Sequence, residues 1–86
     1  MVQLYHPRMI TRRLGPDPRA NALCVSLMNC PDILECEDGA FLVIGEDVTA
    51  LMEGNLALGA SCGPTERIIR IPRATLTLAK ADIPSD

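Results

Sequence analysis

The chain carries a cluster of arginines in its C-terminal half, at Arg67, Arg70 and Arg73. A guanidinium group binds a phosphate or carboxylate through two parallel hydrogen bonds, so these are candidate binding residues for an oxyanion or an acidic partner. A simpler interpretation is that they form ion pairs across neighbouring strands, each worth about 0.2–1 kcal/mol. The acidic residues expected as partners are Asp32, Glu35, Glu37 and Asp38. We expect the ion pairs.

Thiol chemistry is the second possibility that the sequence offers. Cys30 and Cys62 each lie in a predicted loop beside proline or glycine, just before a predicted strand. A redox pair needs at least one lowered thiol pKa, from a helix N-terminus or a nearby cation, and Arg67 is the obvious cation near them in sequence. Two free thiols are the simpler expectation. Because the four cysteines include no Cys-x-x-Cys pair, we expect no metal site and no cofactor.

The residues needed for catalysis do not form a recognisable set. Residues 28–86 hold no histidine and no tyrosine, and their hydroxyl side chains have no neighbouring base to activate them. Glu46 and Asp47 could act as a carboxylate pair, but helix capping explains them more simply. The segment 59–63 has glycines, yet it lacks the lysine of a phosphate-binding loop. We therefore expect no enzymatic activity.

The composition of the chain changes at Met28. Residues 1–28 carry four arginines against one aspartate, a net charge of +3, and residues 29–86 carry four basic and ten acidic side chains, a net charge of −6. Three prolines interrupt the first segment. We therefore predict a flexible or extension segment at residues 1–27 and a small domain at residues 28–86. An acidic domain is a poor general binder of nucleic acid, because phosphate contact needs local positive charge.

Two short apolar segments predict a β-hairpin. Residues 33–36 and 40–45 flank the turn at residues 37–39, where glycine supplies a positive φ. Cys36 is expected to be a small core residue of the first strand. The continuous apolar run at residues 41–44 indicates a strand that is covered on both faces.

A helix, a strand and a second helix are expected to follow the hairpin. Asp47 can cap a helix that begins near Val48. Residues 66–71 predict a third strand, which Pro72 ends because proline has no N–H to donate. Residues 73–81 predict a second helix, and a strand is the alternative because residues 75–78 alternate between polar and apolar. The predicted fold is α+β in the order ββαβα, with a three-stranded antiparallel sheet and one or two helices.

A domain of this size has a thin core and benefits from a partner. Tyr5 and Phe41 are the only aromatic residues of the chain, and a domain of about 60 residues buries only about 60% of its unfolded surface. The apolar strand at residues 41–44 needs a surface to cover it, so we expect a partner, either a second copy in a homodimer or another protein. No apolar run approaches the roughly 18–20 residues of a membrane helix and no secretory signal is recognised, so we expect a cytoplasmic protein without membrane contact.

Four segments from residue 30 onward follow a family-like pattern: Cys30–Glu35, Glu37–Phe41, Val43–Thr49 and Cys62–Arg73. Over roughly residues 28–83 the chain resembles a family of small bacterial proteins of actinobacterial type, which often begin near the position of Met28. That family has no known activity, so the resemblance implies no particular chemistry. The chain departs from the pattern at Cys36, Ala40 and residues 54–58.

A shorter resemblance involves residues 67–73 and the helix expected after them. This segment is similar to the strand-Ile-Pro-basic-helix phrase of AbrB-like swapped-hairpin regulators, which are dimeric DNA-binding domains and often antitoxins. The glycine that usually precedes the strand is missing.

We therefore expect a small, non-enzymatic binding or adaptor protein. The first alternative is an AbrB-like DNA-binding regulator, which requires Arg67, Arg70 and Arg73 on one exposed face. The second alternative is a thiol redox module, which requires Cys30 and Cys62 close enough to form a bond.

Overall fold

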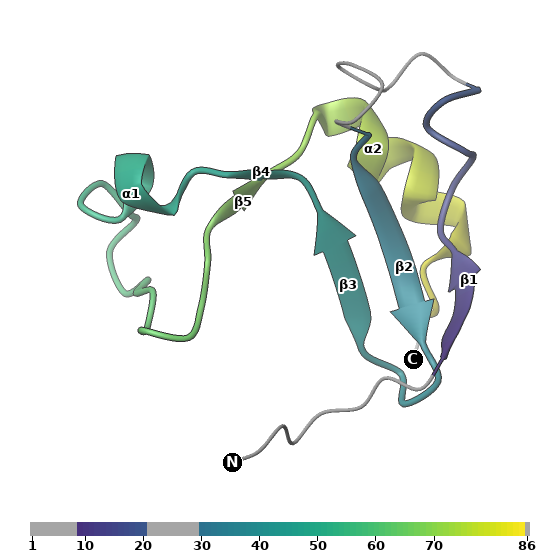
Figure 1. Ribbon diagram of the computed structural model, residues 1–86, viewed down its shortest axis with the longest axis horizontal. Helices are drawn as coiled ribbons and strands as arrows, with labels where there is room; N and C mark the ends of the chain where they lie inside the picture. Colours follow the sequence, from purple (N-terminus) through teal and green to yellow (C-terminus); the bar gives the residue numbers. More distant parts are fainter. Residues whose placement is uncertain (1–8, 21–29, 86) are drawn as a thin grey trace.

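The computed structural model describes residues 9–20 and 30–85 of the chain (Figure 1). Its elements follow in the order β1 (Ile10–Arg13), β2 (Asp32–Cys36), β3 (Phe41–Ile44), β4 (Glu46–Asp47), α1 (Thr49–Met52), β5 (Ile69–Arg70), α2 (Arg73–Ala79) and η1 (Lys80–Asp82). The strands form a three-stranded antiparallel sheet and a separate two-stranded sheet. The predicted α+β class is confirmed. In the described ranges, no helix is long and apolar enough to cross a membrane.

The hairpin of β2 and β3 forms the centre and one edge of the larger sheet, whose strand order is β1-β2-β3. Ile33 faces Val43 across the hairpin. Gly39 closes the turn with a φ of 90°, and the Cys36 N–H donates to the Ala40 carbonyl oxygen at 2.9 Å. The predicted hairpin is confirmed. It forms because the glycine of the Asp-Gly sequence supplies the positive φ that this turn requires.

The third strand of the larger sheet is β1, which pairs antiparallel with β2. The N–H of Leu14 donates to the carbonyl oxygen of Ile33 at 2.8 Å, and Leu14 is only 3% exposed. The sequence placed residues 1–27 outside the domain and predicted the third strand at residues 66–71. The structure corrects both expectations for residues 10–14. Sequence reasoning missed this strand because its side chains are exposed and show no apolar alternation.

Only two residues of the predicted strand at residues 66–71 are in a strand, Ile69 and Arg70, and they pair with β4. Gly45 joins β3 to β4 at a point where β5 passes close by. A Cβ atom built on Gly45 would lie 2.6 Å from the carbonyl oxygen of Arg70, so glycine is required there. The resulting ribbon leads away from the larger sheet, and α1 lies at its far end (Figure 1).

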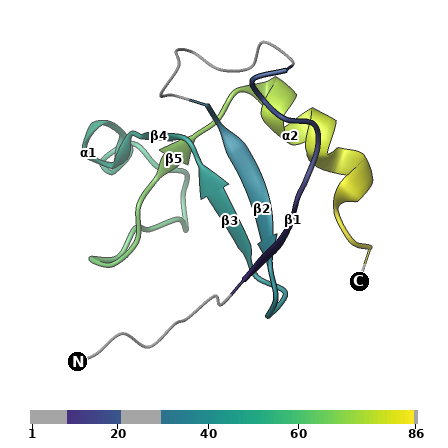
Figure 2. The ribbon, with the colours of Figure 1, turned by 45° about the vertical axis from the view of Figure 1, so that its right-hand side comes forward.

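Helix α2 begins directly after Pro72, whose fixed φ of −62° suits the start of a helix. The helix packs against one face of the larger sheet, over β2 (Figure 2). Its Ala79 is fully buried in a cluster with Leu14 and Ile33, and the partly buried Ile71 packs against this cluster. The second helix predicted from the sequence is thus confirmed, and it completes a small core.

Candidate functional site

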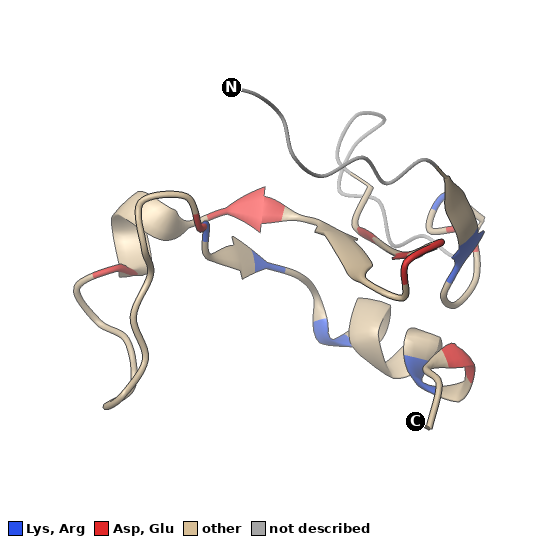
Figure 3. Cartoon of the chain, turned by 90° about the horizontal axis from the view of Figure 1, so that it is seen from below, with Lys and Arg blue, Asp and Glu red and all other residues tan. Residues whose placement is uncertain are grey.

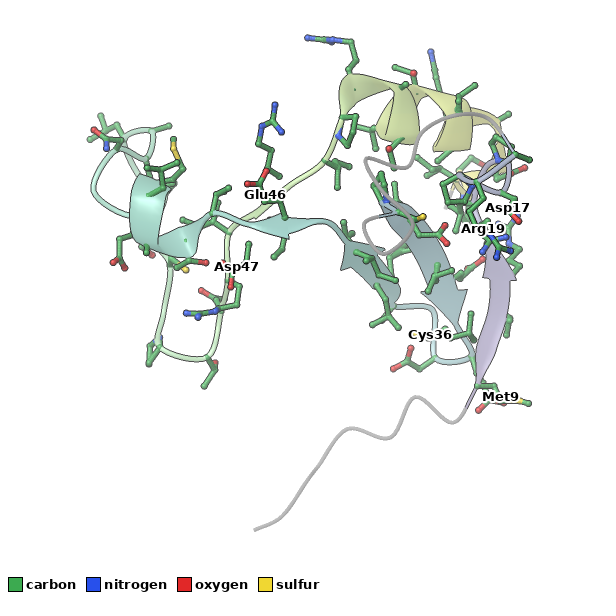
Figure 4. All side chains as sticks on the ribbon, turned by 45° about the horizontal axis from the view of Figure 1, so that its top comes forward. Met9, Asp17, Arg19, Cys36, Glu46 and Asp47 are labelled. Carbon is green, nitrogen blue, oxygen red and sulfur yellow. The ribbon has the colours of Figure 1, made fainter. Side chains whose placement is uncertain are left out.

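Two of the three predicted arginines pair with the acidic residues of β4. Nε of Arg67 lies 3.3 Å from Oδ2 of Asp47, and Nη1 of Arg70 lies 3.5 Å from Oε1 of Glu46. The two carboxylates project from β4 to opposite sides (Figure 4). All four side chains are about half exposed or more, so water screens both pairs and each contributes little to stability. The ion pairs expected from the sequence exist, but their partners belong to β4 and not to the hairpin.

The acidic residues of β2 pair instead with arginines of β1. Nε of Arg12 lies 2.7 Å from Oε1 of Glu35, and Nε of Arg13 lies 3.1 Å and 3.0 Å from the two carboxylate oxygens of Asp32. Arg12 also donates to the carbonyl oxygen of Asp82 at 2.6 Å. Figure 3 shows the basic segment of β1 at this end of the larger sheet. Arg12 and Arg13 of β1 therefore compensate the negative charges of Glu35 and Asp32 in β2.

Arg73 is separate from both groups, because it is the exposed first residue of α2. Within the described ranges, no ion pair joins it to an acidic side chain. The three predicted binding residues thus lie on three different parts of the chain: before β5, in β5 and at the start of α2. Arg67 and Arg70 pair on opposite sides of the ribbon, so the three arginines do not converge on one ligand.

Asp47 is the centre of a small hydrogen-bond network at the base of α1. Its Oδ1 accepts hydrogen bonds from the Thr49 N–H at 3.0 Å and from the Thr49 hydroxyl at 2.6 Å. The Thr49 oxygen in turn accepts from the Ile68 N–H at 2.7 Å. These bonds, with the nearby Arg67, hold the pKa of Asp47 below its ordinary value. The N-cap of α1 is Val48, which makes no side-chain cap bond. Asp47 is therefore not the cap that the sequence predicted, and it binds the first residue of α1 from one position before the N-cap.

A second carboxylate with a lowered pKa lies before β2, in the turn that follows β1. The Arg19 guanidinium donates to both oxygens of Asp17, and the Arg19 N–H adds a further bond, which together lower the pKa of Asp17 (Figure 4). The same contact raises the pKa of Arg19. This is a local turn contact between exposed groups.

Cys30 and Cys62 are not bonded to each other, so the alternative of a redox pair lacks the bond that it requires. Cys30 is disulfide-bonded, whereas Cys62 is a free thiol whose Sγ–H donates to the Glu66 carbonyl oxygen at 3.3 Å. The expectation of a free thiol is thus right for Cys62 and wrong for Cys30. Cys36 is 2% exposed, as a small core residue should be. In the described parts of the chain, no three His, Cys, Asp or Glu side chains are grouped so as to hold a metal ion.

Exposed apolar side chains are the prominent surface feature that sequence reasoning underestimated. Twelve large apolar residues among those described are at least 36% exposed: Met9, Ile10, Phe41, Val43, Ile44, Leu51, Met52, Leu58, Ile69, Leu76, Leu78 and Ile83. Three of them lie in β3, which the sequence predicted to be covered on both faces. The apolar run at residues 41–44 indicated a strand in the sequence. The strand order of the larger sheet places that strand at an edge, where its side chains are exposed.

Comparisons with protein-family models, with curated proteins and with solved structures found no match to this chain. The resemblance to the small bacterial family accordingly stays a prediction.

Proposed function

We propose that the chain is a small, non-enzymatic binding protein, of the adaptor type, that docks onto another protein. The observation that carries this proposal is the ratio of exposed to buried apolar residues. Among the described residues, four hydrophobic side chains are buried and twelve large ones are exposed. Single exposed apolar side chains are ordinary, whereas grouped ones mark sites of interaction.

The surface that best suits a partner protein is on α2. Leu76 and Leu78 are 52% and 45% exposed, and they flank the buried stripe formed by Thr75 and Ala79. We call these two leucines the helix surface. Leu76 and Leu78 are two residues apart and lie on opposite flanks of α2, so a partner must cover the helix from both sides to bury them. The partner should therefore present an apolar surface of its own.

The two alternatives have less support. The guanidinium groups of Arg67 and Arg70 are already paired with carboxylates, and the chain has a net charge of −3, which opposes a DNA-binding function. The thiol hypothesis needed a bond between Cys30 and Cys62, and Cys62 is free. Among the described residues, no contact favours DNA binding or a bond between Cys30 and Cys62.

The proposal is tested by placing a photo-crosslinking amino acid at position 76 in cells that produce the protein naturally. We expect a covalent adduct with a different protein, and we expect Leu78→Asp to reduce that adduct strongly. The matched control carries the crosslinker at Glu37, an exposed position in the hairpin turn. Adducts at position 76 that contain no other protein, or that equal those at position 37, would contradict the proposal.

A further inference from the structure

Residues 46–70 form an arm that extends from the main body of the fold. The arm comprises the ribbon of β4 and β5, the single turn of α1 and the loop that connects α1 to β5. Strands β1, β2 and β3 and helix α2 pack together, whereas β4 and β5 pack on each other. Figures 1 and 2 both show α1 and the loop standing away from the larger sheet. A two-stranded ribbon alone is marginally stable in water, so an arm of this kind needs cover.

The far end of the arm is largely apolar, and between residues 48 and 65 Glu53 is its one charged residue. Leu51, Met52 and Leu58 are 73%, 36% and 105% exposed. The loop at residues 54–65 contains no charged side chain. Burying Leu51, Met52 and Leu58 would therefore remove apolar surface from water, provided that the exposed Glu53 carboxylate stays at the rim of the contact.

A matching apolar surface lies on β3, at the edge of the larger sheet. Phe41, Val43 and Ile44 are 44%, 45% and 50% exposed, and residues 39–45 carry no charge. The carbonyl oxygen of Ile33 accepts from β1, so Val43, which faces Ile33, directs its own backbone groups away from β2. The outer edge of β3 is thus an apolar strand with backbone donors and acceptors available for pairing.

The arm cannot reach β3 of its own chain. Gly45 is the single residue between β3 and β4, and a Cβ atom there would lie 2.7 Å from Cγ2 of Ile71 as well as close to Arg70. Ile71 follows β5 directly, at the other end of the arm, and packs against the core. Folding the arm back onto β3 would disrupt the close packing at Gly45 and the contact of Ile71 with the core. An equivalent arm from a second copy has no such restriction.

The exposed area of the chain is large enough for an interface of this kind. The whole chain exposes 6648 Å², whereas a folded monomer of 9.3 kDa should expose about 5,000 Å². The apolar residues of the arm and of β3 lie within the described ranges. A stable dimer needs about 600–1,000 Å² from each partner.

We propose that two copies of the chain associate by exchanging arms, with the apolar end of each arm covering β3 of the other copy. A two-fold axis then generates two identical contacts, and each contact joins an arm to an edge strand. The inference is independent of the partner protein proposed above, because it leaves the helix surface free.

Sedimentation velocity on the full-length chain tests the arm exchange. We expect the wild-type protein to sediment as a dimer, and we expect Leu58→Asp in the arm and Val43→Asp in β3 each to weaken the dimer by about ten- to a hundred-fold. Leu76→Asp, on the helix surface, is the matched control and should remain dimeric. Leu58 has a fully exposed side chain, so its substitution leaves the monomer fold intact, and circular dichroism checks the Val43 variant.

An equimolar mixture of the two weakened variants gives the decisive result. The intact arm of the Val43→Asp chain can still cover the intact β3 of the Leu58→Asp chain, so the mixture should recover dimer where each variant alone does not. A monomeric wild-type protein, a dimer that Leu58→Asp leaves unchanged, or a mixture that stays monomeric would each overturn the exchange. A crosslink from position 76 to another protein would then still support the proposed function.

Discussion

The guanidinium of Arg13 lies against the carboxylate of Asp32, with Nε 3.0 Å from Oδ2 and 3.1 Å from Oδ1. This contact joins β1 to β2, two strands that the chain separates by a long connection. The Asp32 side chain is only 10% exposed, whereas that of Arg13 is 38% exposed. A largely buried carboxylate thus depends on an arginine from the segment that sequence reasoning placed outside the domain.

Replacing Arg13 should destabilise the fold. Arg13→Ala leaves the Asp32 carboxylate without its charged partner, and we expect a loss of about 1–3 kcal/mol in the free energy of unfolding by urea. Arg19→Ala is the matched control, because the pair of Arg19 with Asp17 is exposed and within one turn. That variant should change the free energy of unfolding much less than Arg13→Ala does, because water screens the exposed pair. Equal effects of the two substitutions would contradict the role given to Asp32.

Removing residues 1–27 should abolish the cooperative thermal transition, because the deletion takes away β1 and the buried Leu14. The single substitution Leu14→Ala should cost about 2–4 kcal/mol of unfolding free energy. Ile10→Ala, in the same strand but at a 52% exposed position, should cost less than about 1 kcal/mol. A truncated chain that still unfolds cooperatively would restore the division at Met28.

Gly45 and Gly54 should respond differently to alanine. Gly45→Ala places a methyl group 2.6 Å from the Arg70 carbonyl oxygen, so we expect a loss of about 1–3 kcal/mol in stability. A Cβ atom on Gly54 meets nothing within 4 Å, and Gly54→Ala should be neutral or stabilising by about 0.4–1 kcal/mol. Chemical denaturation of both variants measures the difference, and a neutral Gly45→Ala would show that the joint is not closely packed.

The hydroxyl of Thr49 should control the titration of Asp47. Thr49→Val removes a hydrogen bond that lowers the Asp47 pKa, so that pKa should rise toward its ordinary value, and Thr49→Ser should restore it. Because the folded-state pKa is lowered, the stabilisation by Asp47 is present above the unfolded-state pKa and is lost as the pH falls below about 4. Carboxyl-carbon NMR titration gives the three pKa values. An unchanged pKa in Thr49→Val would assign the shift to the backbone N–H of residue 49 and to Arg67, both of which that variant keeps.

Local sequence signals predicted the elements whose conformation depends on neighbouring residues. The Asp38-Gly39 pair predicted the hairpin, because glycine adopts the positive φ of its turn at little cost. Pro72 predicted the end of a strand and the start of α2, because its fixed φ suits the first turn of a helix. The α+β class followed from these elements.

Which strand pairs with which was decided only in the tertiary structure. Residues 10–13 carry two arginines and no apolar alternation, so no local pattern marked them as a strand, and their partners in β2 lie far along the chain. The same applies to Arg67 and Arg70, which pair with β4 because β5 passes Gly45 at close range. Ion pairs between distant segments follow strand order and register, and these depend on how the whole chain buries Leu14, Ile33 and Ala79.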